Sequence, residues 1–511
     1  MNLLFKLLEK LRSERSLTAK FLRGGVWLGA GSAGEYGLRF ARNMILARLL
    51  AKEAFGLMAI VLSVCSLFQV LTGLWLKESV VQNPRGAEKT YLNGVWFLAL
   101  GRALLLMLAA YFLAPWIAEF YEAPHLVSLI QIAFLSVLFQ AGISPRAYVA
   151  IKHMQYRKWV MVQQGGGIIG VSITIVLAFY LKSVWALAIG YVAENAARCL
   201  VSYIIFPYLP SPRFEKSDVQ SLFSFSKGMM GMPVLMLIYT EGATFVTGKV
   251  CSKELLGLFA LTLSLARIPG MFGQMLVDLL LPSFSQIQQQ TQRLNHNLLR
   301  VTSVITFVAV PALVATALFG EEILTLVYGK AYARGSVALS LLFANEMMLT
   351  CNIPIASLFI ARGQPALLRR FSLFRALVMV SLAYPAIKYF DIVGAAATPL
   401  VAMCLAYGLQ LHALRTLTGL RASEYIGVFI RSALLSIPPV FSWFVFKLIF
   451  HAPAKWVPIV WTVSLTTLVY VLLAVVILRH DALKKYFWPY QRPTVRPRPA
   501  IAPAMALAIE D

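Results

Sequence analysis

The chain has 511 residues, of which 59% are hydrophobic and only 13% are charged, and its formal net charge is +24 at pH 7. A protein with so few charged residues has too little polar surface to cover itself, which excludes an ordinary soluble domain. Because no nucleic-acid-binding motif interrupts the apolar stretches, the basic excess indicates contacts with anionic lipids and no nucleic-acid partner.

Apolar stretches long enough to cross a bilayer follow one another almost end to end, about 14 in number. A span needs about 20 mostly apolar residues, and backbone polar groups cannot be left unpaired in lipid, so the spans are helices. The expected helices are 21–46, 55–76, 91–114, 125–143, 159–181, 184–207, 228–248, 255–286, 299–319, 336–361, 367–388, 393–414, 425–450 and 457–479. The sequence therefore predicts an all-α polytopic membrane protein.

Basic residues gather before the first span and in alternate loops. Examples are the fourth loop, with Arg146, Lys152, Arg157 and Lys158, and the tenth, with Arg362, Arg369, Arg370 and Arg375. The positive-inside rule places these segments and both termini in the cytoplasm. No small-residue cleavage site follows a short apolar core, so we expect the first helix to be retained.

The spans fall into two sets of six and a final pair. The expected units are an interfacial amphipathic segment at 1–20, a first lobe at 21–207, a cytoplasmic linker at 208–227, a second lobe at 228–420, two extra helices within 421–480, and a proline-rich cytoplasmic tail at 481–511.

An internal repeat supports the two sets. Residues 52–63 read KEAFGLMAIVLS and residues 253–264 read KELLGLFALTLS, and each segment opens the second helix of its set. Repeats separated by six spans share one orientation, so their symmetry axis runs along the membrane normal. This arrangement favours a binding site between the lobes near midplane, with alternating access by rocking.

Two GxxxG pairs, Gly25 with Gly29 and Gly166 with Gly170, predict close helix contacts. The five cysteines are scattered and the six histidines form no cluster, so we expect no metal site and no cofactor.

Charged residues inside the spans are the candidate functional residues, since a charge at mid-bilayer costs at least ~2.5–3.5 kcal/mol. Glu35, Arg39 and Arg42 share one face of the first helix. Glu194 and Arg198 lie four apart on the sixth, while Arg102 lies in the third. Arg267 lies mid-span in the eighth helix, directly before a kink expected at Pro269.

Two interpretations of these charges stay open. The carboxylates and guanidiniums form structural pairs, or the arginines line a wet cavity and bind an anion, with Arg39 and Arg267 facing each other between the lobes. Arginine suits phosphate oxygens because its planar fork donates two parallel hydrogen bonds and does not deprotonate. Glu241, Asp278 and Glu346 are the acidic candidates for ion coupling, with no particular ion assigned.

Three segments resemble one transporter family. RLLAKEAFGLMAIVLSVCSLFQVLTGLWLKESVVQ (48–82) resembles the second-helix region of Wzx-type flippases for lipid-linked oligosaccharides. LLGLFALTLSLARIPGMFGQMLVDLLLPSFSQIQ (255–288) and FGEEILTLVYGKAYARGSVALSLL (319–342) are similar to the eighth-helix region and the ninth-to-tenth loop. The family is the polysaccharide transporter branch of the multidrug/oligosaccharidyl-lipid/polysaccharide exporter superfamily, nearest its exopolysaccharide and colanic-acid-like subgroup.

The resemblance implies a V-shaped fold like that of multidrug and toxin exporters, with two pseudo-symmetric six-helix lobes and two extra C-terminal helices. It also implies a substrate: undecaprenyl-diphosphate-linked oligosaccharide repeat units, moved from the cytoplasmic to the periplasmic leaflet of the bacterial inner membrane through a cationic central cavity. The units would serve lipopolysaccharide or exopolysaccharide synthesis, with a polysaccharide polymerase and export machinery as further partners.

Three alternatives compete with this interpretation. A multidrug exporter of the same superfamily is disfavoured by the extra helix pair and the central arginines. A polyprenyl-dependent glycosyltransferase, polymerase or ligase is disfavoured because no outside loop is large, so we do not expect an enzyme. A major-facilitator transporter is disfavoured because such proteins carry a charged, glycine-rich loop between helices two and three. This chain reads QNPRGAEK (82–89) there, which does not fit.

Overall fold

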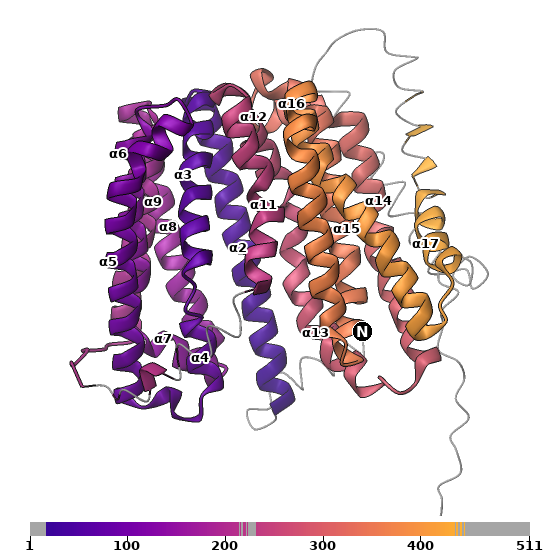
Figure 1. The fold of residues 1–511 in the computed structure, drawn as a ribbon, viewed down its shortest axis with the longest axis horizontal. Helices are drawn as coiled ribbons and strands as arrows, with labels where there is room; N and C mark the ends of the chain where they lie inside the picture. The colour runs from indigo at the N-terminus through magenta and orange to yellow at the C-terminus, as the bar shows by residue number, and fades with distance from the viewer. Residues whose placement is uncertain are drawn as a thin grey trace, which may run out of the picture.

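The computed structural model describes residues 17–434 apart from 214, 216–217, 221 and 223–230, together with 436–437, 440–441 and 444. Every regular element in this part of the chain is a helix. Figure 1 shows the helices running up and down side by side, with the first lobe coloured indigo to magenta and the second magenta to orange. The amphipathic segment before residue 17, the expected span 457–479 and the tail 481–511 lie outside the described residues.

The first lobe starts at the lower end of the molecule in Figure 1, where α2 begins. Its helices are α2 (Leu17–Leu49), α3 (Lys52–Leu71), α4 (Leu76–Gln82), η1 (Pro84–Ala87), α5 (Lys89–Phe120), α6 (Leu126–Ala141), α7 (Arg146–Lys152), α8 (Tyr156–Leu181) and α9 (Val184–Ile205). The predicted span 55–76 ends early, at Leu71. The chain turns at Trp75, whose backbone adopts the left-handed conformation (φ 44°), before the short α4 begins.

The second lobe repeats the up-and-down arrangement. Its helices are α11 (Gly231–Val250), α12 (Lys253–Ala266), η2 (Ile268–Phe272), α13 (Gly273–Gln286), α14 (Thr291–Val327), η3 (Lys330–Gly335), α15 (Ser336–Ala361), α16 (Pro365–Thr418) and α17 (Ala422–Leu434). The expected kink at Pro269 is confirmed, since η2 separates α12 from α13 there. The spans predicted at 367–388 and 393–414 are the two arms of α16, which break at Asp391.

Local sequence signals mark the start of one of these helices and the end of another. Ser252 caps α12, where its side chain accepts a hydrogen bond from the backbone N–H of Leu255 at 3.2 Å. Gly419 ends α16 with φ 71°, the left-handed conformation that glycine adopts without penalty. Each predicted span up to the twelfth has a helical counterpart, and α17 opens the thirteenth.

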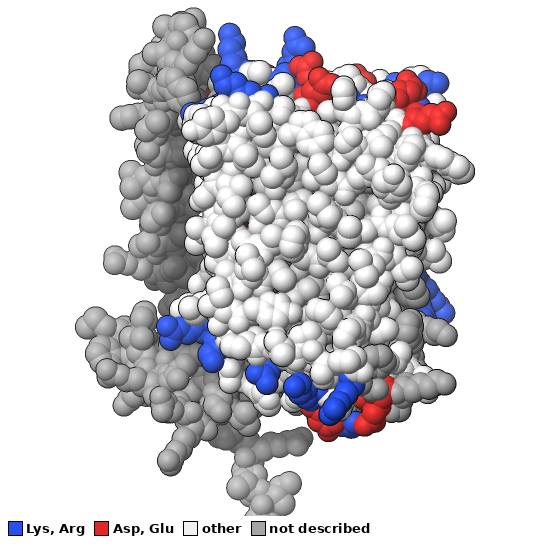
Figure 2. All heavy atoms as spheres, turned by 90° about the vertical axis from the view of Figure 1, so that its left-hand side faces the viewer, with Lys and Arg blue, Asp and Glu red and all other residues white. Residues whose placement is uncertain are grey.

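The helix surfaces indicate burial in a bilayer. Seven described helices are long and apolar enough to cross a membrane, or eight if the bent pair α6 and α7 is one span. On α5 the small residues Ala103 and Ala114 face inward, while Leu105 and Trp116 are 68% and 73% exposed. Figure 2 shows the same pattern on one whole face, where most charged side chains gather at two rims with a broad uncharged band between them. The chain is therefore a multi-pass membrane protein.

The two lobes touch where the repeated segments meet, near the upper end of α3 and α12. A Cβ on Gly56 would lie 2.0 Å from the carbonyl oxygen of Lys253, and one on Gly257 would lie 1.8 Å from that of Lys52. Only glycine permits this backbone approach. The repeat found in the sequence thus forms a pseudo-symmetric helix crossing between the lobes.

Ion pairs reinforce this upper contact between lobes. Lys52 Nζ lies 2.9 Å from Glu254 Oε1, and Lys249 Nζ lies 2.7 Å from Glu122 Oε1. Each lysine lowers the pKa of its partner carboxyl, chiefly through the hydrogen bond and then through charge attraction. In this state the lobes are joined at the upper end.

Candidate functional site

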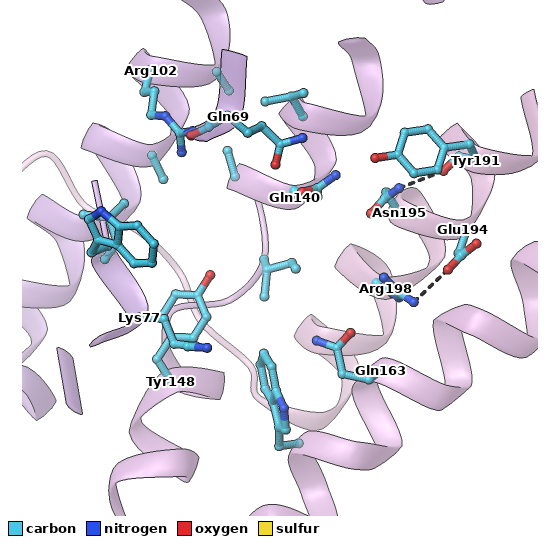
Figure 3. Close-up of a pocket in the computed structure, with 18 of the residues that line it drawn as sticks. Gln69, Lys77, Arg102, Gln140, Tyr148, Gln163, Tyr191, Glu194, Asn195 and Arg198 are labelled. Atoms are coloured by element: carbon cyan, nitrogen blue, oxygen red, sulfur yellow. Dashed lines mark hydrogen bonds and ion pairs between the residues drawn. The ribbon is translucent and has the colours of Figure 1, made fainter. Parts of the chain in front are cut away.

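A cavity of about 710 Å³ lies inside the first lobe, between α2 and α9 on one side and α4 and α5 on the other (Figure 3). The cavity is also lined by Gln69 in the lower half of α3, by Gln163 near the start of α8, and by residues of the short helices α4 and α7. Above it the lobe is packed by buried apolar side chains such as Phe55 and Ile60. The cavity therefore closes toward the upper end.

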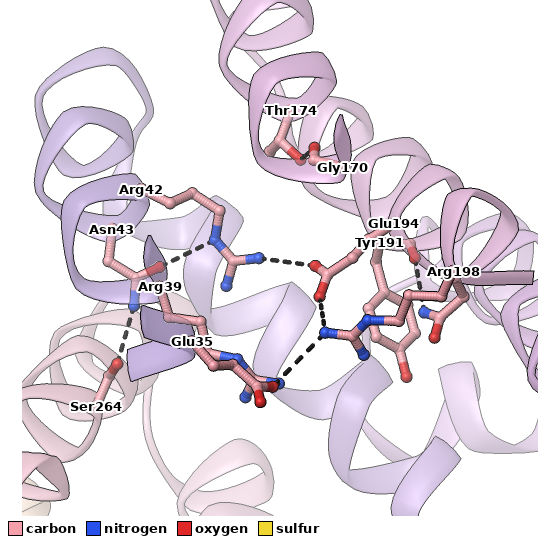
Figure 4. Close-up of polar contacts among 11 residues, drawn as sticks. Glu35, Arg39, Arg42, Asn43, Gly170, Thr174, Tyr191, Glu194, Arg198 and Ser264 are labelled. Carbon is pink, nitrogen blue, oxygen red and sulfur yellow. Dashed lines mark hydrogen bonds and ion pairs between the residues drawn. The ribbon is translucent and has the colours of Figure 1, made fainter. Parts of the chain in front are cut away.

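The wall formed by α2 and α9 carries a chain of alternating charges (Figure 4). Arg39 lies 2.8 Å from Glu35, which lies 3.6 Å from Arg198. Arg198 in turn lies 2.7 Å from Glu194, and Glu194 lies 3.4 Å from Arg42. Both intrahelical pairs foreseen in the sequence are present, but they are joined into one network. Three guanidiniums share two carboxylates, so the network carries a net charge of +1.

The members of this network differ in their access to the cavity. The Glu194 side chain is 8% exposed and that of Arg198 14%, whereas that of Arg39 is 51% exposed. The Nε of Arg198 is buried and has no hydrogen-bond partner among the described residues. Arg39 thus offers accessible donors to an anion, while Glu194 holds Arg42 and Arg198 in place.

Glycines on α8 let α9 bring its charges this close. A Cβ on Gly166 would lie 2.2 Å from Arg198 Cγ, and one on Gly170 would lie 2.3 Å from Glu194 Cβ. The close contact predicted from this GxxxG pair is confirmed. The other pair gives no such contact: Gly29 has nothing within 4 Å, and the surroundings of Gly25 lie outside what is described.

The opposite wall carries Arg102 on α5 (Figure 3). Its Nε donates to Thr72 Oγ1 at 3.0 Å and its Nη2 to the carbonyl oxygen of Gln69 at 2.7 Å. Lys77 on α4 is paired with Glu78 at 3.1 Å. Five cations and two carboxylates line the cavity, so its lining is positive: the cations are Arg39, Arg42, Lys77, Arg102 and Arg198, and the carboxylates are Glu78 and Glu194.

Sequence reasoning missed the neutral part of the lining. Its polar and aromatic residues are Gln69, Trp75, Gln140, Tyr148, Trp159, Gln163, Tyr191 and Asn195. Single amides and aromatic rings in apolar helices are common, so nothing in the sequence separates these from packing residues. The one available signal was the glutamines inside spans, which are costly in lipid unless they face a cavity or a partner.

Arg267 lies elsewhere and is not among the residues that line this cavity. It follows the last residue of α12, donates through Nη2 to the carbonyl oxygen of Thr240 at 3.3 Å, and lies 4.0 Å from Glu241. The Asn43 side chain donates to Ser264 Oγ at 2.9 Å between the lobes. Arg39 and Arg267 are each about one helical turn below this bond, on neighbouring helices of the two lobes.

The three acidic candidates lie on different helices of the second lobe, and Glu241 and Glu346 both interact with the charge of Arg267. Glu241 on α11 accepts a hydrogen bond from Ser63 Oγ of the first lobe at 2.7 Å, so it lies at the lobe interface. Glu346 lies on α15 beside η2, where a Cβ on Gly270 would be 3.2 Å from its Oε2. Asp278 is on α13, and its side chain lies outside the described part of the chain. The described residues hold no metal-binding group of three or more His, Cys, Asp or Glu.

One buried arginine lies in a place the sequence did not suggest. Arg375, assigned to the tenth loop, is inside α16 and only 6% exposed. That assignment is wrong: the expected span 367–388 itself contains Arg375, and α16, which begins at Pro365, carries it into the lobe. There its guanidinium stacks on the Tyr239 ring at 4.2 Å and donates to Met403 Sδ at 3.5 Å.

The chain is similar to curated polysaccharide proteins along most of its length. It is 23% identical to the lipopolysaccharide biosynthesis protein WzxC of Escherichia coli strain K12, over 71% of this chain and 75% of that one. It is 24% identical to the succinoglycan biosynthesis transport protein ExoT of Rhizobium meliloti strain 1021, over 74% and 76%. A probable low-salt glycan biosynthesis flippase, Agl15 of Haloferax volcanii, is 24% identical over 40% of this chain and 43% of that one.

Solved structures share the fold. The lipid II flippase MurJ in an inward closed conformation superposes with a TM-score of 0.73 at 13% identity, covering 89% of this chain and 99% of that one. A multidrug resistance transporter of the MATE family, in the MOP superfamily, in an inward-facing conformation gives a TM-score of 0.58 at 13% identity, covering 76% of this chain and 96% of that one. The expected V-shaped two-lobed fold is thereby confirmed. A family model described as polysaccharide biosynthesis protein matches residues 45–337, and the chain belongs to that family.

Proposed function

We propose that this protein is a flippase for undecaprenyl-diphosphate-linked oligosaccharides in the bacterial inner membrane. It carries repeat units for cell-surface or exopolysaccharide synthesis from the cytoplasmic to the periplasmic leaflet, with both termini in the cytoplasm and without catalysing a reaction. The lower end of Figure 1 is then the cytoplasmic end, and the first-lobe cavity is in its cytoplasm-facing state.

The observation that carries this proposal is the positive cavity, closed at its upper end, inside a transporter bundle. A diphosphate is a compact dianion at a lipid headgroup, and guanidinium forks bind phosphate oxygens with two parallel hydrogen bonds. The half-exposed Arg39 supplies those donors on one wall, and Arg198, which lines the cavity beside it, adds positive charge there. A cationic drug would meet a repulsive lining there.

The network also suggests how the site holds charge when no substrate is bound. Glu35 is shared by Arg39 and Arg198, and a carboxylate that is 36% exposed can leave them for water when a diphosphate arrives. Glu194 stays buried and keeps Arg42 and Arg198 oriented. The substrate phosphates thus replace a weak, solvated carboxylate, which limits the desolvation penalty of binding.

Transfer to the other leaflet follows from separation of the upper contacts. Rocking the lobes against each other about an axis in the membrane plane breaks the Gly56–Gly257 crossing and the two lysine–glutamate pairs, and it closes the lower end. Arg267, which lies at the height of Arg39 on the second lobe, then binds the headgroup together with the first-lobe arginines. Glu241 is the best placed of the three acidic candidates for ion coupling, because its bond to Ser63 joins the lobes; Glu346 and Asp278 remain candidates.

The partners follow from the substrate. A polysaccharide polymerase and export machinery would receive the delivered units, and anionic lipids would contact the basic lower rim. The relatives are named for lipopolysaccharide, succinoglycan and glycan biosynthesis, which supports this class of substrate.

A translocation assay tests the proposal. Purified protein in proteoliposomes is given an undecaprenyl-diphosphate disaccharide with a fluorescent tag, and flipping is read by quenching from outside. Arg39→Gln and Arg198→Gln are expected to slow flipping about tenfold or more, since each removes charged hydrogen bonds. Arg146→Gln is the control, because Arg146 donates to the carbonyl of Pro207 at the lower rim, outside the cavity.

Two results would overturn the proposal. One is flipping at the rate of protein-free liposomes under all conditions tested. The other is transport of a cationic dye such as rhodamine that survives both arginine substitutions, which would indicate a multidrug exporter.

A further inference from the structure

Arg102 is a second cationic position in the cavity, separate from the network on α2 and α9. It projects from α5, and Figure 3 places it across the cavity from Arg198. Its two partners are neutral, the hydroxyl of Thr72 and the carbonyl oxygen of Gln69. Among the described residues it has no carboxylate within ion-pair distance. A full positive charge therefore stands on the wall opposite the arginines to which we assign the diphosphate.

The hydrogen bonds of Arg102 leave one edge of its guanidinium free. Nε and Nη2 form the side edge, and both of its parallel N–H groups are occupied by Thr72 and Gln69. Nη1 makes no hydrogen bond within the described part of the chain. The end edge, made by Nη1 and the second hydrogen of Nη2, is thus open for a bidentate carboxylate. Thr72 cannot turn away, because its own hydroxyl donates to the carbonyl oxygen of Phe68.

The rest of this wall suits a sugar better than a second phosphate. Gln69 and Gln140 line the cavity near this side, and their amides offer both donors and acceptors to hydroxyl groups. Lys77 does not add a free charge, since Glu78 neutralises it at 3.1 Å. One unpaired guanidinium balances one singly charged carboxylate, whereas a phosphate monoester carries about −1.5 to −2 at pH 7.

We propose that Arg102 binds a carboxylate on the sugar part of the substrate, so that the lipid-linked oligosaccharide this protein prefers carries an acidic sugar such as a uronate. This inference rests on the proposed function and adds the chemical class of its oligosaccharide. A cavity of about 710 Å³ is within the usual range for small-molecule sites and takes a headgroup with its first sugars. The acidic sugar is therefore one of the first two after the diphosphate.

The test compares four probes on the full-length protein in nanodiscs. They are undecaprenyl diphosphate with no sugar, the same lipid with a neutral glucose disaccharide, and two forms of that disaccharide with glucuronate as the first or second sugar. Dissociation constants are measured for wild type, Arg102→Gln and Arg102→Lys. Wild type is expected to prefer a glucuronate form over the neutral form by about tenfold, and Arg102→Gln is expected to abolish that preference.

The variants separate a binding role from a folding role. Arg102→Lys keeps the charge but loses the fork, so it is expected to retain part of the preference. Arg146→Gln, which removes an arginine outside the cavity, is expected to keep the preference in full. Thermal unfolding of each variant is recorded, so that a misfolded protein is recognised by its melting temperature, and the preference is then read from Arg102→Lys.

The outcomes are distinct for the two proposals. If none of the sugar-bearing lipids binds or is flipped, the proposed function fails and this inference fails with it. If the neutral and acidic forms bind equally to wild type, only the inference fails. If Arg102→Gln weakens the sugar-free lipid as much as the acidic form, Arg102 belongs to the diphosphate site and the inference is wrong.

Discussion

The crossing of α3 and α12 makes Gly56→Ala the sharpest structural perturbation. The new Cβ would lie 2.0 Å from the Lys253 carbonyl oxygen, whereas real Cβ contacts stay beyond 3.0 Å. The two backbones must therefore separate by about 1 Å at the only point where the repeats meet so closely among the described residues. Overpacking of this kind costs about 1–3 kcal/mol.

That strain acts on one conformation only. It is present while the upper ends of the lobes touch and is relieved when they part, so the equilibrium shifts toward the upper-open state. A penalty of about 1.4 kcal/mol changes the ratio of the two states tenfold. Gly408→Ala is the matched control, because a Cβ there has nothing within 4 Å.

The assay is a distance measurement across the upper end. Spin labels are placed at Lys182 on the first lobe and Tyr389 on the second, both exposed, in a background without the five native cysteines. Double electron–electron resonance is expected to show a longer distance gaining population in Gly56→Ala and not in Gly408→Ala. An unchanged distance distribution together with an unchanged melting temperature would refute the glycine crossing.

Three further predictions follow from the same contacts. Gly166→Ala pushes α9 away at Arg198 and is expected to lower both stability and flipping, measured by thermal unfolding and by the proteoliposome assay; wild-type values in both would contradict the packing. Glu194→Gln leaves two guanidiniums without their shared carboxylate and is expected to destabilise the protein by about 3 kcal/mol, the low end for a broken buried pair, measured by denaturant titration. Because their lysine partners lower the pKa values of Glu122 and Glu254, the upper contact is stabilised above the ordinary carboxyl pKa and weakens as the pH falls through the lowered values. The spin-label distance should therefore lengthen on acidification, and a pH-independent distance would exclude a role for these pairs.

The helix pattern could be predicted from the sequence because long apolar runs can only form helices when they cross a membrane in this way. The repeat could be predicted for a more local reason: the glycines shared by 52–63 and 253–264 form the contact itself, and Lys52 of the first segment pairs with Glu254 of the second. Residue spacing likewise identified the pairs Glu35–Arg39 and Glu194–Arg198, since residues four apart share a helix face.

Contacts between helices that lie far apart in the sequence could not be predicted from residue spacing. Nothing in the sequence tells that Arg42 reaches Glu194 or that Arg198 also reaches Glu35, because those contacts depend on how α9 packs against α2. The same holds for the position of the cavity, which lies within the first lobe, whereas the repeat favoured a site between the lobes. The burial of Arg375 is, by contrast, consistent with the expected span 367–388, which contains it.

The central claim is that first-lobe arginines hold the substrate diphosphate, and an experimental structure with undecaprenyl diphosphate bound tests it most directly. The expected result is density for the two phosphates within hydrogen-bond distance of Arg39 and Arg198, with Glu35 displaced. Phosphate density elsewhere in the bundle, with the Glu35–Arg39 and Glu35–Arg198 contacts intact, would contradict it.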